Sequence, residues 1–248
     1  MRKHVGYLLV ACSIGLLALA SGPSWAGDDS GARMPEFEAD YELRRNNTRA
    51  ARLTRRLQCA DGECRFESKG QTVGIIDLLL RGRIEEWTTF SLTEDGGFRP
   101  REYYYRQRAR GDNNEYARLF FNPDTGRVAS RGDNTWEQEV EGEAMDELLS
   151  QLRLMMAVRA GEERMSFSVV DSDGDLDRYD FVVVGRESVD TPAGTFEAVK
   201  VERERSSSRR ITTMWFAPEL EYMPIIVRHE RVGRETYTAT LKELTRAP

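Results

Sequence analysis

From Phe37 onward, apolar and charged residues alternate along the chain with a period of two. In the first such segment, Phe37, Ala39, Tyr41 and Leu43 alternate with acidic residues, which is typical of a β-strand with one buried face. Turn sequences rich in glycine, asparagine and proline separate the segments, so the pattern predicts an antiparallel meander. The further predicted strands are residues 48–58, 63–70, 83–93, 98–109, 115–122, 127–131, 164–171, 177–185, 195–205, 209–217, 222–232 and 234–245.

One segment, residues 144–159, departs from this period. Its apolar side chains recur at three- and four-residue steps, which predicts an amphipathic helix that ends near Gly161. A long sheet with one apolar face must bury that face, so we expect this helix to cover it. Whether residues 73–79 form a second short helix or a turn stays open. The residues that set the helical period are Met145, Leu148, Leu149, Leu152, Met155 and Met156.

The first 26 residues have the order of a secretory signal: a basic start, an apolar run over residues 5–20, and small residues at Ser24 and Ala26. We therefore predict a signal peptide at 1–26, a flexible leader at 27–35 and a single β-rich domain at 36–246. A cleaved signal implies a periplasmic protein. The alternative is a lipoprotein anchored at Cys12, which follows Leu9-Val10-Ala11; it is less favoured because the apolar run continues beyond Cys12.

Cys59 and Cys64 remain in the predicted mature chain, separated by four residues that include Asp61-Gly62. In an oxidising compartment this spacing predicts a disulfide across a hairpin. A redox-active pair is the alternative, but the spacing is not that of a C-x-x-C motif and no helix start follows.

Charge narrows the classes of partner. Of 36 basic and 42 acidic residues, the predicted signal removes Arg2 and Lys3 and no acid, which leaves a net charge of −8. An acidic chain gains little from counterion release, so we expect no nucleic-acid partner. No later apolar run approaches the roughly 20 residues of a membrane span, so we expect no transmembrane segment in the mature chain and at most peripheral association with the envelope.

Catalytic and metal-binding patterns are weak. His229 is the one histidine of the predicted mature chain, and without a G-x-S-x-G elbow a hydrolase using it is the least favoured hypothesis. The acidic stretch 171–177 lacks the glycine and glutamate positions of a calcium loop, which favours a hairpin turn. Glu85 and Glu86 suggest a solvated face rather than a catalytic pair. We expect no catalytic residue, no cofactor and no metal ion.

Arginine is abundant along residues 99–110, where five arginines flank Tyr103, Tyr104 and Tyr105. Such a surface suits carboxylates, phosphates or lipid headgroups. The alternative, cross-strand pairing with the many acidic residues, is favoured. The arginines are Arg99, Arg101, Arg106, Arg108 and Arg110.

The last third of the chain carries a T-x-x-G-x-F turn at 191–196, a W-x-x-P step at 215–218 and a Pro-Ile strand start at 224–225. With the opening Phe37–Tyr41 segment, these motifs resemble DUF3108, a family of secreted bacterial envelope proteins of unknown function, over roughly residues 36–245. The resemblance supplies no catalytic residue. It implies a more distant similarity to lipoprotein carriers, whose antiparallel sheet curls into a half-open barrel with a helix on the concave side.

A curled sheet with an incompletely filled apolar interior is a natural container for an acyl chain. We therefore expect a lipid, a lipoprotein or another amphiphile as ligand. The alternative is a non-enzymatic envelope assembly factor that acts through protein contacts and has a fully packed interior. Core packing alone also explains the candidate ligand-binding residues, and which face of strand 209–217 points inward stays open. The candidates are Met145, Leu149, Leu152, Met156, Met214 and Phe216.

Overall fold

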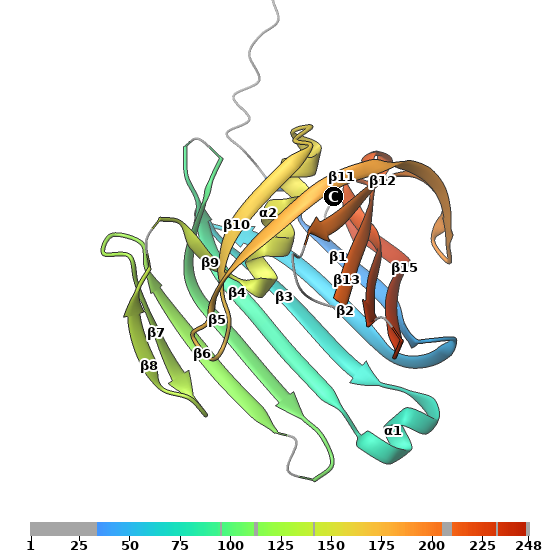
Figure 1. Ribbon diagram of the computed structural model, residues 1–248, viewed down its shortest axis with the longest axis horizontal. Coiled ribbons are helices and arrows are strands. Elements are labelled where there is room, and N and C mark those ends of the chain that lie inside the picture. Colours follow the sequence, from blue (N-terminus) through green and yellow to red (C-terminus); the bar gives the residue numbers. More distant parts are fainter. Residues whose placement is uncertain are drawn as a thin grey trace, which may run out of the picture. The chain divides into compact units, whose positions relative to one another are not determined.

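The computed structural model describes residues 34–246 except 95, 112–113, 141, 205–209 and 232 (Figure 1). The predicted signal peptide, Cys12 and nearly all of the predicted leader lie outside the described residues. Those predictions therefore stay predictions.

One 15-stranded sheet contains all the strands of the described residues and forms the predicted half-open barrel (Figure 1). Neighbours are consecutive in sequence except that β1 pairs with β15. Every pair is antiparallel except β9 with β10, so the predicted meander is confirmed. The strands are β1 (Phe37–Arg45), β2 (Thr48–Ala60), β3 (Glu63–Thr72), β4 (Arg83–Leu92), β5 (Phe98–Arg108), β6 (Glu115–Asn122), β7 (Arg127–Gly132), β8 (Trp136–Glu139), β9 (Ala144–Asp146), β10 (Arg164–Val170), β11 (Leu176–Thr191), β12 (Gly194–Glu204), β13 (Arg210–Ala217), β14 (Met223–Arg231) and β15 (Thr236–Arg246).

Helix α2 (Glu147–Arg159) lies in the concave side of the sheet, as expected, but begins later than residue 144 (Figure 1). Residues 144–146 instead form β9, which pairs in parallel with β10. Asp146 sets the boundary because its carboxylate accepts a hydrogen bond from the backbone N–H of Leu149 at 2.8 Å and so caps the helix.

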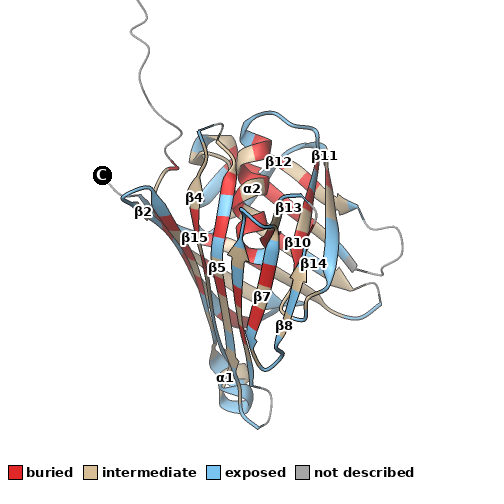
Figure 2. Ribbon diagram, turned by 90° about the vertical axis from the view of Figure 1, so that its left-hand side faces the viewer, coloured by how far each residue is buried: buried red, intermediate tan, exposed pale blue. Residues whose placement is uncertain are grey.

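The sheet buries α2 on nearly every side (Figure 2). Leu148, Leu149 and Leu154 are fully buried, and polar Ser150 is 3% exposed. Among the helix residues only Glu147 and Arg159, at its two ends, are exposed. The helix is therefore the centre of the core rather than a lid on its surface.

Two shorter helical segments complete the fold. Helix α1 (Gly74–Leu80) connects β3 to β4 and settles the open question at residues 73–79. The 3-10 helix η1 (Pro218–Leu220) connects β13 to β14.

The hairpin of β2 and β3 carries the predicted disulfide. Cys59 and Cys64 face each other in the ladder, and their sulfur atoms are bonded. The bond closes the hairpin at the end that lies away from α1.

On the β5–β6 side of the sheet, part of the arginine-rich stretch pairs across strands, as favoured. Arg99 contacts Asp124 at 2.9 Å and Arg101 contacts Glu63 at 3.1 Å. Tyr104 stacks on Trp87 with 5.2 Å between ring centroids. These contacts occupy Tyr104 and two of the five arginines of this stretch within the sheet itself.

Candidate functional site

The strand register places a row of polar side chains across the concave face. Arg55 on β2 is opposite Ser68 on β3, Ser68 is opposite Glu86 on β4, and Glu86 is opposite Tyr105 on β5. Side chains that are directly opposed in a sheet share one face. We call Arg55, Ser68, Glu86 and Tyr105 the polar row.

Different surroundings flank the polar row on its two sides. One step toward α2, the aligned residues Leu57, Phe66 and Thr88 are all buried beneath the helix. One step toward α1, the aligned residues are Leu53, Gly70, Ile84 and Gln107. Helix α2 does not extend over these residues, so this end of the concave face is left open.

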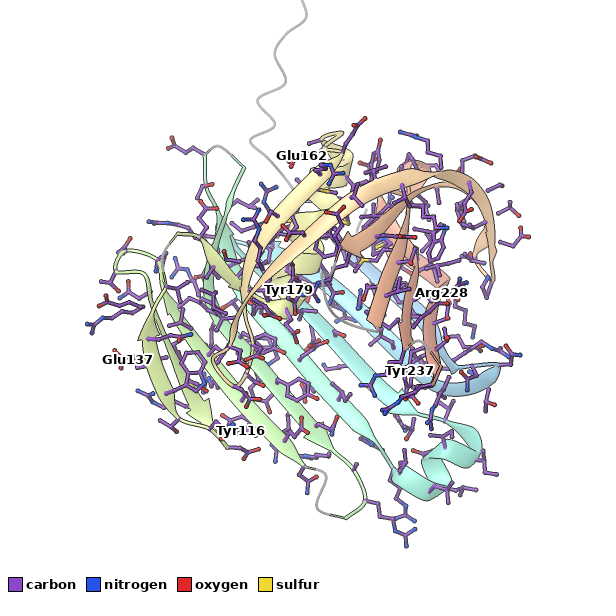
Figure 3. All side chains as sticks on the ribbon, viewed as in Figure 1. Tyr116, Glu137, Glu162, Tyr179, Arg228 and Tyr237 are labelled. Atoms are coloured by element: carbon purple, nitrogen blue, oxygen red, sulfur yellow. A yellow bond between two sulfur atoms is a disulfide. The ribbon has the colours of Figure 1, made fainter. Side chains whose placement is uncertain are left out.

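Two cavities meet at the polar row, and both are lined by Arg55 and Glu86. The first, which we call the charged cavity, has a volume of about 270 Å³. Its opposite wall contains Glu147, Tyr179 and Arg203. Figure 3 shows Tyr179 on the concave side, beside the end of α2.

The second cavity, which we call the apolar groove, has a volume of about 470 Å³ and extends from the polar row to α1. Tyr237 lies on its β15 side (Figure 3). Residues from seven elements line it, which explains why no single sequence segment reveals it. Its apolar lining includes Leu43, Leu53, Ile76, Leu80, Ile84 and Tyr237.

Arg55 is the residue on which the site is centred. It is 9% exposed, and its Nε atom has no hydrogen-bond partner among the described residues. Its guanidinium carbon lies 5.5 Å from the ring centroid of Tyr41. A buried guanidinium donor without an acceptor is costly, which points to an acceptor that arrives with a ligand.

Glu86 does not fully supply that acceptor. Burial raises the pKa of its carboxyl group. The charge of Arg55 and hydrogen bonds from Ser68 and from Tyr103, the latter at 3.3 Å, lower the pKa again but only in part. The neutral form of Glu86 is thus favoured relative to an exposed glutamate. The Arg55 Nε donor therefore stays without an acceptor beside Glu86 in the part of the chain that the structure describes, and an anionic group of a ligand could supply one.

The opposite wall of the charged cavity is already paired. The hydroxyl of Tyr179 donates to Glu147 at 2.6 Å, and the Arg203 guanidinium lies 3.2 Å from the Tyr179 ring centroid. Burial raises the pKa of Tyr179, which keeps its hydroxyl a donor. This wall is a fixed polar surface opposite Arg55.

His229 lies at the edge of the charged cavity, exposed, with Nδ1 at 2.9 Å from the hydroxyl of Thr212. The side chain is therefore accessible to the cavity. Thr212, which also lines this cavity, is thus a hydrogen-bond partner of the His229 ring.

The six candidate residues from the sequence do not gather at one site. Met214 lines the charged cavity, whereas Met145 lines a separate cavity of about 220 Å³ between β5, β6 and β9. Leu149, Leu152 and Phe216 lie in the packed core. Met156 is half-buried against that core. Their contact with a ligand stays a prediction.

The structure also answers which face of β13 points inward. Thr212 and Met214 line the charged cavity. Trp215, on the other face, is nevertheless only 4% exposed because Lys200 and Arg228 lie over its ring at 5.3 and 5.1 Å. Both faces of this strand are therefore covered, one by the core and one by long charged side chains.

Sequence reasoning missed Arg55 and misplaced Glu86, which points into the concave side instead of lying on a solvated face. A signal for Arg55 exists in the sequence. Leu53, Arg55 and Leu57 share one face of a strand whose inward positions are otherwise apolar. A charge at an inward position is a stronger indication of a site than a charge on an alternating polar face.

Within the described ranges, no three His, Cys, Asp or Glu side chains lie close enough together to bind a metal ion. The acidic stretch forms the β10–β11 turn, and the Asp171 carboxylate accepts the backbone N–H groups of Asp173 and Asp175, each at 2.9 Å. Among the described residues, no helix is long and apolar enough to span a membrane.

Comparison with known proteins shows similarity in sequence and in fold. The family model described as "Protein of unknown function (DUF3108)" matches residues 36–242. A search of curated proteins finds no match to the chain.

Two solved structures are similar to this chain. A crystal structure described as a β-barrel-like protein of a domain of unknown function, DUF1849, from Brucella abortus has a TM-score of 0.58 and 12% identity, covering 87% of this chain and 99% of that one. A crystal structure described as a putative lipoprotein from Parabacteroides distasonis has a TM-score of 0.32 and 11% identity, covering 86% and 96%. The first of these supports the barrel-like fold.

Proposed function

Because the chain belongs to DUF3108, a family of proteins of unknown function, we propose that its concave face binds an amphiphile with an acidic head and an apolar tail. The head contacts Arg55 in the polar row, and the tail lies in the apolar groove. The observation that carries the proposal is the buried Nε donor of Arg55, which lacks an acceptor where the two cavities meet.

The dimensions of the site support this proposal. A groove of about 470 Å³ is within the range of roughly 300–1,000 Å³ that is usual for small-molecule sites. Its lining is mainly apolar, while its inner end is charged. An acyl chain with a carboxylate or phosphate head has the same polarity.

The envelope setting of the proposal follows from the predicted signal peptide. We propose an exported, periplasmic protein whose residues 36–246 act as a single domain, with a lipid anchor at Cys12 as the less favoured alternative. The alternative function is that of an assembly factor acting through protein contacts, for which we expect a fully packed interior. The two cavities at the polar row weigh against it.

The test uses the mature chain, stripped of bound lipid, and a fluorescent fatty acid as the probe. Arg55→Gln removes the charge that contacts the head, and we expect binding at least about tenfold weaker, since hydrogen bonds to charged groups contribute roughly 1.5–3 kcal/mol. Arg56→Gln is the matched control because Arg56 is the next residue, on the opposite face, where it pairs with Glu38.

Native mass spectrometry of the protein as purified gives an independent measurement. Co-purified lipid on the wild type, reduced on Arg55→Gln and retained on Arg56→Gln, is the expected result. If the wild type carries no lipid and takes up no fatty acid, or if both variants bind like the wild type, the proposal is wrong.

A further inference from the structure

Helix α1 has two apolar faces, and only one of them belongs to the groove. Ile76 and Leu80, one helical turn apart, line the apolar groove. Ile75, Leu78 and Leu79 point away from it and are 67%, 73% and 63% exposed. Large apolar side chains gathered at such exposures are unusual for a folded domain and mark an interaction surface.

The segment is held in this position by hydrogen bonds. The Thr72 hydroxyl donates to the Asp77 carboxylate at 2.8 Å, and the backbone N–H of Arg110 donates to the carbonyl of Leu80 at 2.7 Å. The N–H of Val73 donates to Ala50 at 3.0 Å. The exposed side chains are therefore presented by a fixed helix at the tip of the β3–β4 connection (Figure 1).

Positive charge surrounds this apolar tip. Arg81, Arg83 and Arg108 are exposed, and Arg83 is directly opposite Arg108 in the β4–β5 ladder. Like charges in that position destabilise a sheet. No carboxylate in the described part of the chain forms a salt bridge with any of the three. Asp77, the one acid of the helix, is already bonded to Thr72.

We propose that α1 and these three arginines dock the protein on an anionic phospholipid bilayer. Ile75, Leu78 and Leu79 enter the interface, and the arginines contact the headgroup phosphates. The groove, lined by the other face of the same helix and by Arg83 and Arg108, then opens at the membrane surface. This inference deepens the proposed function, since it makes the bilayer the source or destination of the amphiphile.

A second copy of the chain fits this surface less well than a bilayer does. A stable protein interface takes roughly 20–30 residues from each side, whereas α1 has seven residues. Two copies meeting at α1 would also bring their arginines together. A membrane interface needs neither a large area nor a complementary protein surface.

The test is co-flotation of the mature wild-type protein with vesicles of phosphatidylcholine, with and without phosphatidylglycerol. We expect binding to the anionic vesicles and a loss of at least tenfold for Leu78→Ser/Leu79→Ser. Each single arginine variant should bind the anionic vesicles about fivefold more weakly at low salt, and this difference should diminish at high salt. The variants are Arg81→Gln, Arg83→Gln and Arg108→Gln. Leu176→Ser/Val184→Ser is the matched control, since Leu176 and Val184 are 50% and 47% exposed on β11.

The experiment separates this inference from the proposed function. Leu78 and Leu79 do not line the groove, so Leu78→Ser/Leu79→Ser should retain uptake of the fluorescent fatty acid while losing vesicle binding. Equal binding to both kinds of vesicle, no vesicle binding by the wild type, or a dimer that this variant converts to a monomer would each overturn the inference. Vesicle binding without fatty-acid uptake would support docking and contradict the proposed function.

Discussion

Gly174 lies directly against the indole ring of Trp136, so closely that a Cβ atom on Gly174 would be 2.9 Å from Cε2 of the indole. The indole Nε1 donates to the carbonyl of Ser172 at 3.1 Å, and Gln138 donates to the carbonyl of Gly174 at 2.8 Å. Trp136 and Gln138 are on β8, at one end of the sheet, whereas Gly174 is in the β10–β11 turn, near the other. Side chains therefore bridge the gap that no backbone ladder closes.

Gly174→Ala should weaken this bridge. Its φ of +92° already disfavours alanine, and the new methyl group would overlap the indole ring. We expect the free energy of unfolding to fall by roughly 1–2 kcal/mol because of the backbone conformation and by roughly a further 1–3 kcal/mol because of overpacking against the indole ring. Urea unfolding measures the total, and hydrogen exchange along β8 locates the change.

Gly161→Ala is the control for the backbone contribution. Gly161 also has a positive φ, of +82°, but a Cβ atom there meets nothing within 4 Å. Only Gly174→Ala should speed exchange in β8. Equal losses of stability in the two variants, with unchanged exchange, would mean that the contact with Trp136 contributes nothing.

Asp146 gives a prediction about pH. Burial raises its pKa to about 7, in spite of the hydrogen bonds that its carboxylate accepts from Leu149 and Thr88. Because the folded-state pKa lies above the unfolded value near 3.8, the folded protein holds a proton that the unfolded chain releases between these values. The stability contributed by this group is therefore present at pH 4 and is lost as the pH rises to 7, by up to about 4 kcal/mol.

Asp146→Asn mimics the protonated form, since its amide oxygen accepts from Leu149 and its NH₂ group donates to the Thr88 hydroxyl. The variant should gain stability relative to the wild type between pH 5 and pH 8, as measured by urea unfolding at each pH. Asp177→Asn makes the same change at an exposed position and should not. A constant difference between Asp146→Asn and wild type across this range would contradict a raised pKa.

The period-two pattern predicted most of the strands because one face of the sheet is buried along its length. It failed where strands are too short to show a period, as in β8 and β9, with four and three residues. Met145 fits both the strand and the helical period, and only the cap by Asp146 decides between them. Residues 186–190 of β11 were missed because they are mostly exposed and polar.

The candidate site was harder to predict than the fold. Arg55 and Glu86 lie on different strands, and their proximity depends on the register through Ser68. Sequence alone identifies a charge on an apolar face but not its neighbours across the sheet. The apolar groove depends further on where α2 begins, which the cap by Asp146 sets and the helical period did not define.

The disulfide between Cys59 and Cys64 should stabilise the β2–β3 hairpin modestly. A loop of this size restrains the unfolded chain by about 2 kcal/mol on the entropy model. Adding a reductant to the wild type should lower its free energy of unfolding by about that amount. Cys59→Ala/Cys64→Ala should be insensitive to the reductant, and an unchanged wild type would show that the hairpin is equally restrained without the bond.

Gly70 offers a way to fill the apolar groove without disturbing the sheet. It lies between Leu53 and Ile84 in the register, and a Cβ atom there would be 3.9 Å from Leu53 Cδ1 and 3.8 Å from Ile84 Cβ, at ordinary contact distances. Gly70→Leu should therefore fold normally while its side chain occupies the space proposed for the tail.

We expect Gly70→Leu to weaken binding of palmitate about fiftyfold and to leave acetate, whose two carbons end within the polar row, nearly unaffected. A leucine side chain displaces about three methylene groups of a tail that fills the groove, and each contributes about 0.8 kcal/mol when buried. Lys69→Leu adds the same side chain on the opposite face and should change neither affinity. Only a ligand whose tail reaches past the polar row should be weakened by Gly70→Leu. If this substitution weakens both ligands equally, the tail does not lie between Leu53 and Ile84.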